Sequence, residues 1–86
     1  MNITYRKSFR KSYEKLSLTQ KKKVETALSL FEKDPFTKTL HNHPLAGRLK
    51  EYRSMSAGFD LRIIFKQDQE YVEVSLVDVG SHNQVY

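Results

Sequence analysis

The sequence contains no cysteine and no tryptophan in its 86 residues. The lack of cysteine excludes disulfide bonds, thiolate metal sites and a cysteine nucleophile, and it fits a reducing cytoplasm. No apolar run approaches the roughly 20 residues that a membrane helix needs, and no apolar segment follows the first basic residues as it would in a secretory signal. We therefore expect one cytoplasmic domain, residues 1–86, without a membrane partner.

Acidic residues are scarce at the start of the chain. Residues 1–23 carry eight basic side chains and one acidic side chain, whereas residues 24–86 carry seven basic and nine acidic side chains. A concentrated basic segment is typical of proteins that bind a polyanion, either a nucleic acid or an acidic protein. The alternative is a solvated helix surface on a basic protein.

The first half of the chain has the spacing of a strand and two helices. Residues 2–5 are typical of a short strand. Apolar residues at i, i+4 and i+7 then predict a helix over residues 8–16, on Phe9, Tyr13 and Leu16. A second helix is predicted to begin after an N-cap at Thr19 and to end before Pro35. Its apolar face has the spacing i, i+3, i+4, i+7, on Val24, Ala27, Leu28 and Phe31.

Beyond an irregular polar segment, residues 36–47, the hydrophobic period changes to two. Alternation predicts strands over residues 49–55 and 59–66, and a nearly continuous apolar run predicts a central strand over residues 71–79. The tail after this strand, residues 80–86, is predicted to be short and irregular. The order β-α-α-β-β-β predicts an α+β fold, in which a two-helix hairpin packs on one face of a small antiparallel sheet.

Alternation on the strand at residues 59–66 separates apolar from charged side chains. The apolar set is predicted to face the helices, and it comprises Phe59, Leu61, Ile63 and Phe65. Asp60, Arg62 and Lys66 then share the open face. Asp60 and Arg62 can be a surface ion pair, which their spacing alone favours, or a base beside a phosphate-binding cation.

Histidines add acid–base chemistry to the same sheet end. His82 follows the last strand, and a hairpin between the last two strands would bring it near Asp60, where it could act as a general acid. His43 can approach the same edge. A metal site is not favoured, because His41 and His43 have no third ligand at a convincing spacing.

At this point the sequence resembles the YafQ branch of the RelE/ParE toxin superfamily over nearly the whole chain. The residues that carry the resemblance are His43-Pro44-Leu45 with Gly47, Tyr52-Arg53, Asp60 within Phe59–Phe65, and Gly80-Ser81-His82 with the terminal aromatic Tyr86. The resemblance implies a microbial RNase fold and cleavage of messenger RNA in the ribosomal A site. It implies no metal or cofactor, attack by the ribose 2′-OH, and a hetero-oligomer with a cognate antitoxin.

The resemblance also assigns roles by position. It implies that His82 is the general acid, that Asp60 or His43 is the general base, and that Arg62 stabilises the phosphorane. Tyr86 would stack on a base. The RNA backbone would be held by basic side chains, namely Arg48, Lys50 and Arg53 with the helix residues Lys22 and Lys23.

One position departs from the family pattern, because Ser56 stands where the YafQ branch has a further histidine. Serine does not transfer protons near neutral pH as histidine does, so the choice between Asp60 and His43 as base stays open. Two other functions compete with RNA cleavage. One is gyrase inhibition, as in the ParE branch, and the other is nucleic-acid binding without catalysis. The joint presence of His43, Asp60 and His82 argues against both.

Overall fold

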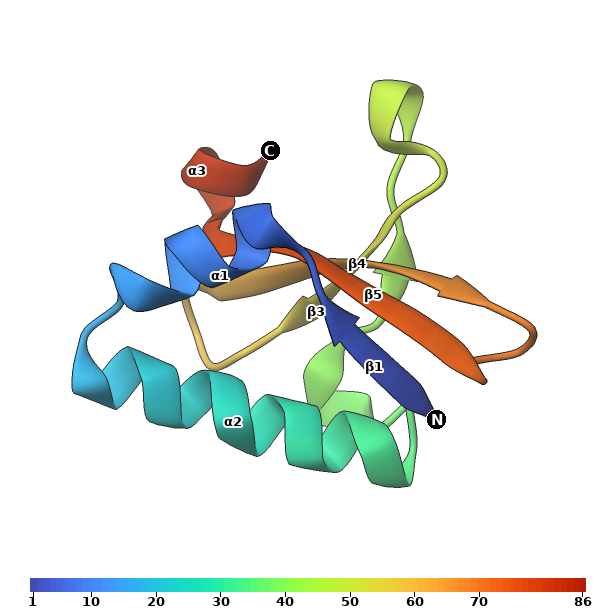
Figure 1. Ribbon diagram of the computed structural model, residues 1–86, viewed down its shortest axis with the longest axis horizontal. Helices are drawn as coiled ribbons and strands as arrows, with labels where there is room; N and C mark the ends of the chain where they lie inside the picture. Colours follow the sequence, from blue (N-terminus) through green and yellow to red (C-terminus); the bar gives the residue numbers. More distant parts are fainter.

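The computed structural model describes residues 1–86. Its elements follow the predicted order, with a two-residue strand and a short C-terminal helix added in segments that the sequence left irregular (Figure 1). They are β1 (Asn2–Tyr5), α1 (Lys7–Glu14), α2 (Leu18–Lys33), the 3-10 turn η1 (Lys38–Leu40), β2 (His43–Pro44), the 3-10 turn η2 (Gly47–Leu49), β3 (Arg53–Ser56), β4 (Leu61–Asp68), β5 (Glu73–Ser81) and α3 (His82–Val85).

The five strands form one sheet in the order β1-β5-β4-β3-β2. The three hairpin-linked strands β3, β4 and β5 pair antiparallel, as predicted, and β2 joins β3 antiparallel as well. The first strand, β1, pairs parallel with β5, so the complete sheet is mixed rather than antiparallel. Parallel neighbours need a long connection between them, and here α1, α2 and the other strands provide it.

The long helix α2 covers one face of the sheet, and α1 runs beside β5 where β1 ends (Figure 1). The predicted apolar face of α2 is buried, on Val24, Ala27, Leu28 and Phe31. The N-cap of α2 is Ser17 rather than Thr19. Ser17 and Gln20 form a reciprocal capping box, which satisfies two backbone N–H groups that an N-cap at Thr19 would leave open.

One hydrophobic cluster of 14 buried residues joins the helices to the sheet. Leu61, Ile63 and Phe65 of β4 belong to it, as their alternation predicted. Next to them, β5 contains a bulge: Ile64 pairs with Asp78 and Phe65 with Leu76, so Val77 has no partner in the ladder. The extra residue shifts the alternation of β5 by one. Leu76 and Val79 therefore both face the core, which accounts for the nearly continuous apolar run.

The structure corrects the prediction for Phe59, whose side chain is 94% exposed. Pairing of β4 with β5 begins only at Leu61, and Phe59 lies in the preceding turn, next to Gly58 with φ +85°. Alternation orients side chains only inside a hydrogen-bonded ladder. The pattern therefore extended the strand two residues too far and gave Phe59 an inward direction that it does not have.

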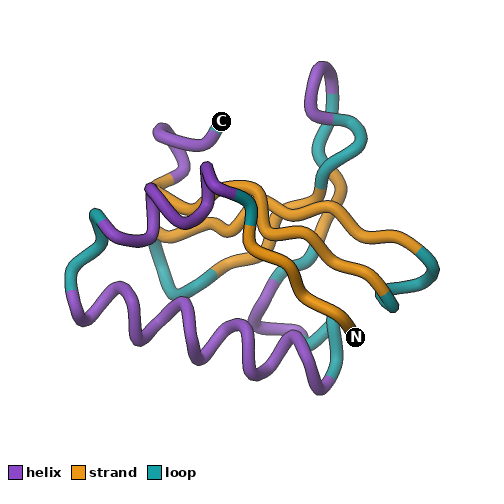
Figure 2. The backbone as a smooth tube through the Cα atoms, in the orientation of Figure 1, coloured by secondary structure: helices purple, strands orange, loops and turns teal.

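Other element boundaries also differ from the sequence prediction. Strand β3 begins at Arg53, because residues 47–49 form the turn η2 within the loop between β2 and β3. The tail is not irregular: β5 continues to Ser81, and His82–Val85 form α3. Figure 2 shows this helix and the β2–β3 loop on the side of the sheet away from α2. No helix is long and apolar enough to cross a membrane.

Candidate active site on the open face of the sheet

The side of the sheet opposite α2, called the open face below, carries a group of polar residues. Met55, Ile63 and Val79 are paired across β3, β4 and β5 and are buried against the helices. Residues one position away point to the opposite side. This places two cross-strand rows on the open face, one of Ser56, Arg62 and Gly80 and one of His43, Ser54, Ile64 and Asp78.

His82 is the first residue of α3, and a second capping box fixes the start of this helix. The Ser81 hydroxyl accepts from the Gln84 backbone N–H at 3.3 Å, and the Ser81 N–H donates to Gln84 Oε1 at 2.8 Å. Gly80 leaves the space that this arrangement needs, because a Cβ there would lie 2.9 Å from Gln84 Oε1. The end of β5 thus sets the direction of His82.

Tyr86 holds His82 from the other side. The two rings pack edge to face with their centroids 4.4 Å apart. The Tyr86 hydroxyl forms a hydrogen bond with the hydroxyl of Ser54, which is fully buried on β3. The C-terminal residue is therefore attached to the sheet, and its ring limits the motion of the imidazole. The predicted role of Tyr86 in stacking on a base is compatible with its partly exposed ring.

Asp60 and Arg62 lie at the same sheet end as His82. Leu61 is paired with Ser81, so Asp60 and His82 flank the last pair of the β4–β5 ladder. The predicted β4–β5 hairpin is therefore present, although Val79 pairs with Ile63 and not with the start of the strand. Arg62 faces Ser56 and Gly80 in its row, and its Nη1 donates to the carbonyl oxygens of Phe59 at 3.2 Å and Leu61 at 2.9 Å. These two bonds hold the guanidinium beside the turn.

His43 lies on β2, two strands away from β4, a backbone separation of roughly 10 Å. Its Nδ1 is 2.7 Å from the carbonyl oxygen of His41. A carbonyl oxygen only accepts hydrogen bonds, so Nδ1 carries the proton that it donates. In the neutral ring, Nε2 then carries no proton, and its lone pair can accept one, as a general base must.

The predicted RNA-binding residues fall into three groups. Arg48 and Lys50 are exposed on the β2–β3 loop, beside the open face. Lys22 and Lys23 are exposed on α2, on the other side of the sheet. Arg53 is half-buried at the start of β3.

Arg53 is occupied by structural contacts on the helix side. Its position two residues before buried Met55 directs it there, and its Nε donates to Asn42 Oδ1 at 2.8 Å. Its guanidinium carbon also lies 5.7 Å from the centroid of the Phe36 ring. The structure therefore does not bring Arg53 to the open face.

Ser54, Ser81 and Gln84 were missed as site residues in the sequence. A Ser-x-x-Gln spacing, as in residues 81–84, is a known signal for a helix start and could have revealed α3. Ser54 carries no such signal, because its partner Tyr86 is 32 residues away. No three metal-ligating side chains lie together in the structure.

The fold is shared with solved structures of bacterial toxins. YafQ from Escherichia coli BL21(DE3) is 22% identical, with a TM-score of 0.78 over 99% of this chain and 97% of that chain. The E. coli DinJ–YafQ toxin–antitoxin complex contains a chain with 23% identity and a TM-score of 0.76 over 99% and 96%. The RelBE2 toxin–antitoxin complex from Mycobacterium tuberculosis matches with 17% identity and a TM-score of 0.64 over 94% and 96%. By fold, the chain is a RelE/YafQ-like α+β protein.

The particular family follows from the sequence. A family model described as the bacterial toxin YafQ of type II toxin–antitoxin systems matches residues 1–86. The chain therefore belongs to the YafQ toxin family, which confirms the resemblance. No curated protein sequence matches the chain.

Proposed function

We propose that this YafQ-family toxin is a ribosome-dependent endoribonuclease that cleaves messenger RNA in the A site by metal-independent acid–base catalysis. The observation that carries the proposal is the arrangement of two histidines on either side of an arginine on the open face. Along the strand order, His82 follows β5, Arg62 lies on β4 and His43 lies on β2. Ribosomes are the site of action, so the proposed location is the cytoplasm.

This order suits in-line displacement at phosphorus. The ribose 2′-oxygen attacks the adjacent phosphorus while a base takes its proton, and the bond from phosphorus to the 5′-oxygen breaks. An acid gives a proton to that 5′-oxygen, and the products are a 2′,3′-cyclic phosphate and a 5′-hydroxyl. Attacking and leaving oxygens lie on opposite sides of the phosphorus. Base and acid must therefore approach from opposite sides, with a cation at the negatively charged centre.

We assign the acid to His82, the phosphate contact to Arg62 and the base to His43. His82 and Asp60 flank the same end of the β4–β5 ladder, so Asp60 as base would approach from the side of the acid. His43 lies on the far side of Arg62 and has its Nε2 free to accept a proton. Ser56, which stands where the family has histidine, faces Arg62 in its row. In this assignment Ser56 transfers no proton, and Asp60 orients the imidazole of His82.

The RNA backbone would cross the open face between α3 and the β2–β3 loop, with Arg48 and Lys50 contributing phosphate contacts. Tyr86 would offer the free part of its ring to a base. We further propose that the chain forms a hetero-oligomer with a cognate antitoxin. The support is the family and the two related structures named as toxin–antitoxin complexes.

The proposal is tested by inducing the wild-type protein, His82→Ala and Asp60→Asn in separate bacterial cultures and mapping a reporter transcript by primer extension. Wild type should arrest growth with discrete in-frame cuts, and His82→Ala should lose both, because general-acid catalysis contributes about 10²–10⁴-fold. Asp60→Asn should retain cuts at the same positions. Growth arrest with intact transcripts and DNA damage would instead indicate a gyrase inhibitor and contradict the proposal.

A further inference from the structure

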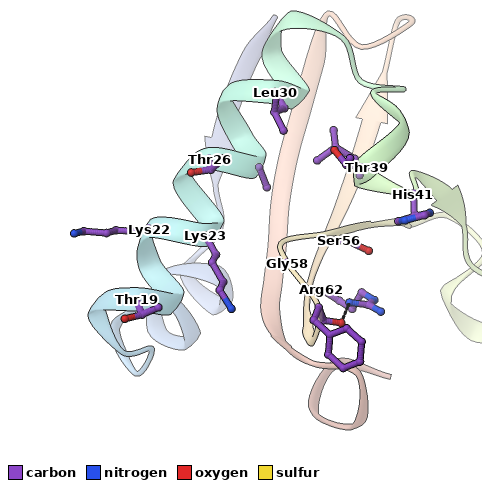
Figure 3. A pocket seen from close by; sticks show the side chains of 13 residues that line it. Thr19, Lys22, Lys23, Thr26, Leu30, Thr39, His41, Ser56, Gly58 and Arg62 are labelled. Carbon is purple, nitrogen blue, oxygen red and sulfur yellow. Dashed lines mark hydrogen bonds between the residues drawn. The ribbon is translucent and has the colours of Figure 1, made fainter.

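A second surface adjoins the open face and is separate from the residues that bracket the proposed cleavage point. It is a groove with a volume of about 650 Å³ between α2, η1 and the turn that joins β3 to β4 (Figure 3). Its basic side chains come from different elements, with Lys23 on α2, His41 after η1 and Arg62 on β4, and no acidic residue lines it. A groove with only positive charge on its walls attracts an anionic chain.

The side chain of Lys23 lies against the turn that joins β3 to β4. A Cβ at Gly58 would lie 3.0 Å from Cδ of Lys23, so the aliphatic part of Lys23 passes directly over this glycine. Figure 3 shows Lys23 extending toward Gly58 and Arg62, while Lys22 extends away from the sheet. The two neighbouring lysines therefore differ in direction, and Lys23 is the one that points to the same part of the groove as Arg62.

Phe59 adds a surface for a flat group. Its ring is 94% exposed at the rim of the groove, and its carbonyl oxygen accepts the 3.2 Å hydrogen bond from Arg62 Nη1. In this position the ring contributes little hydrophobic stabilisation to the fold, because it is not buried in the core. Exposed aromatic rings beside cations form the platform on which proteins stack the bases of single-stranded nucleic acids.

We propose that this groove is a single-stranded RNA subsite, in which a base flanking the scissile phosphate stacks on Phe59 and the next phosphate is bound by Lys23. The inference rests on the proposed function for its direction, because Arg62 and Ser56 belong both to the groove and to the row on the open face. An RNA strand bound at Arg62 can therefore continue past Ser56, at the end of β3, directly into the groove. An acidic polypeptide would meet the same cations but would have no planar group for Phe59.

The test measures binding of a fluorescent, uncleavable 2′-O-methyl RNA of about ten nucleotides by anisotropy at several salt concentrations. Phe59→Ala should weaken binding by about 5-fold or more, since base stacking on an aromatic ring has this magnitude. Lys23→Ala should lower the slope of log affinity against log salt by about 0.7, the loss of one phosphate contact on a single strand. Lys33→Ala, an exposed lysine on the same helix outside the groove, should change neither quantity.

A probe series with one abasic position locates the stacked base. Wild type should lose affinity at one position of the series, and Phe59→Ala should be insensitive to that position. Equal affinities of wild type, Phe59→Ala and Lys23→Ala, or no RNA binding by wild type, would overturn the proposal. So would a Phe59 dependence seen with poly-L-glutamate and not with RNA.

The groove and the proposed cleavage chemistry can fail separately. Cleavage that depends on His82 together with unchanged binding in Phe59→Ala would eliminate the groove alone. Binding that depends on Phe59 in a protein that cuts no RNA would eliminate the RNase and keep the groove.

Discussion

Ser54 and Tyr86 form the contact that connects the end of the chain to the sheet. The Ser54 hydroxyl is fully buried, and Tyr86 provides its side-chain hydrogen bond. Burying a hydroxyl without a partner costs more than a made hydrogen bond contributes. Removing one partner of this hydrogen bond should therefore lower the free energy of unfolding more than removing both partners does.

Tyr86→Phe should lower the free energy of unfolding by about 1–3 kcal/mol, because it leaves the buried Ser54 hydroxyl unpaired. The double variant Ser54→Ala/Tyr86→Phe should recover most of that loss. Urea denaturation of wild type, both single variants and the double variant measures the coupling. Additive losses in the double variant would show that the hydrogen bond contributes nothing to this corner.

Side chains inside regular elements were the most predictable from the sequence. The core residues of α2 and the inward set Leu61, Ile63 and Phe65 were identified because burial follows a local period. Phe59 was misplaced because the period continues by chance into the turn beyond the ladder. The Ser54–Tyr86 bond is a pair of single residues far apart in the chain, and no periodic pattern encodes such a pair.

Two elements begin with the same device. Ser17 and Gln20 cap α2, and Ser81 and Gln84 cap α3, with the same reciprocal pair of hydrogen bonds. The long helix α2 is also stabilised by its buried face, whereas α3 has no fully buried residue of its own. The capping box and Tyr86 are thus the main constraints on α3, and α3 carries His82.

Ser17→Ala and Ser81→Ala form a matched pair. Each removes one cap, which ordinarily costs about 1 kcal/mol. Ser17→Ala should lower the unfolding midpoint and leave the cleavage rate of the folded protein unchanged. Ser81→Ala should reduce the cleavage rate at a temperature where both variants are fully folded, since it releases His82. Equal rates in the two variants would mean that α3 does not need its cap to orient the histidine.

The order of the main elements was predictable, but several element boundaries and one strand direction were not. The apolar periods define α2 and β4, whereas residues 49–51 alternate in the sequence but lie in η2 and the turn that follows it. The parallel pairing of β1 with β5 depends on how the complete chain closes. Local sequence carries no information on that closure.

At the scale of the whole molecule, the sheet separates two surfaces. Helix α2 covers the core, α1 lies beside β5, and α3 and the β2–β3 loop stand on the side away from α2 (Figure 1). The open face between them carries His43, Arg62 and the anchored His82. The groove continues from Arg62 around the edge of β3 toward α2, so the cations of both surfaces can act on one RNA strand.

The same scale explains why the site was only partly predictable. A local hairpin brings His82 and Asp60 to the same sheet end, although its register differs from the predicted one, since Val79 pairs with Ile63. The placement of His43 depends on β2, a strand of two residues without a periodic signal. Arg53 points to the helix side because it shares the face of buried Met55, two residues away on β3.

The most direct test of the acid–base mechanism uses purified protein and ribosomes programmed with a defined messenger RNA. The ends of the cleaved RNA are then identified. Wild type should produce a 2′,3′-cyclic phosphate and a 5′-hydroxyl, and a single 2′-deoxy substitution at the scissile nucleotide should abolish cleavage. His82→Ala should lower the rate by about 10²–10⁴-fold without changing ribosome binding. Cleavage that persists at the 2′-deoxy position, or at the wild-type rate in His82→Ala, would contradict the mechanism.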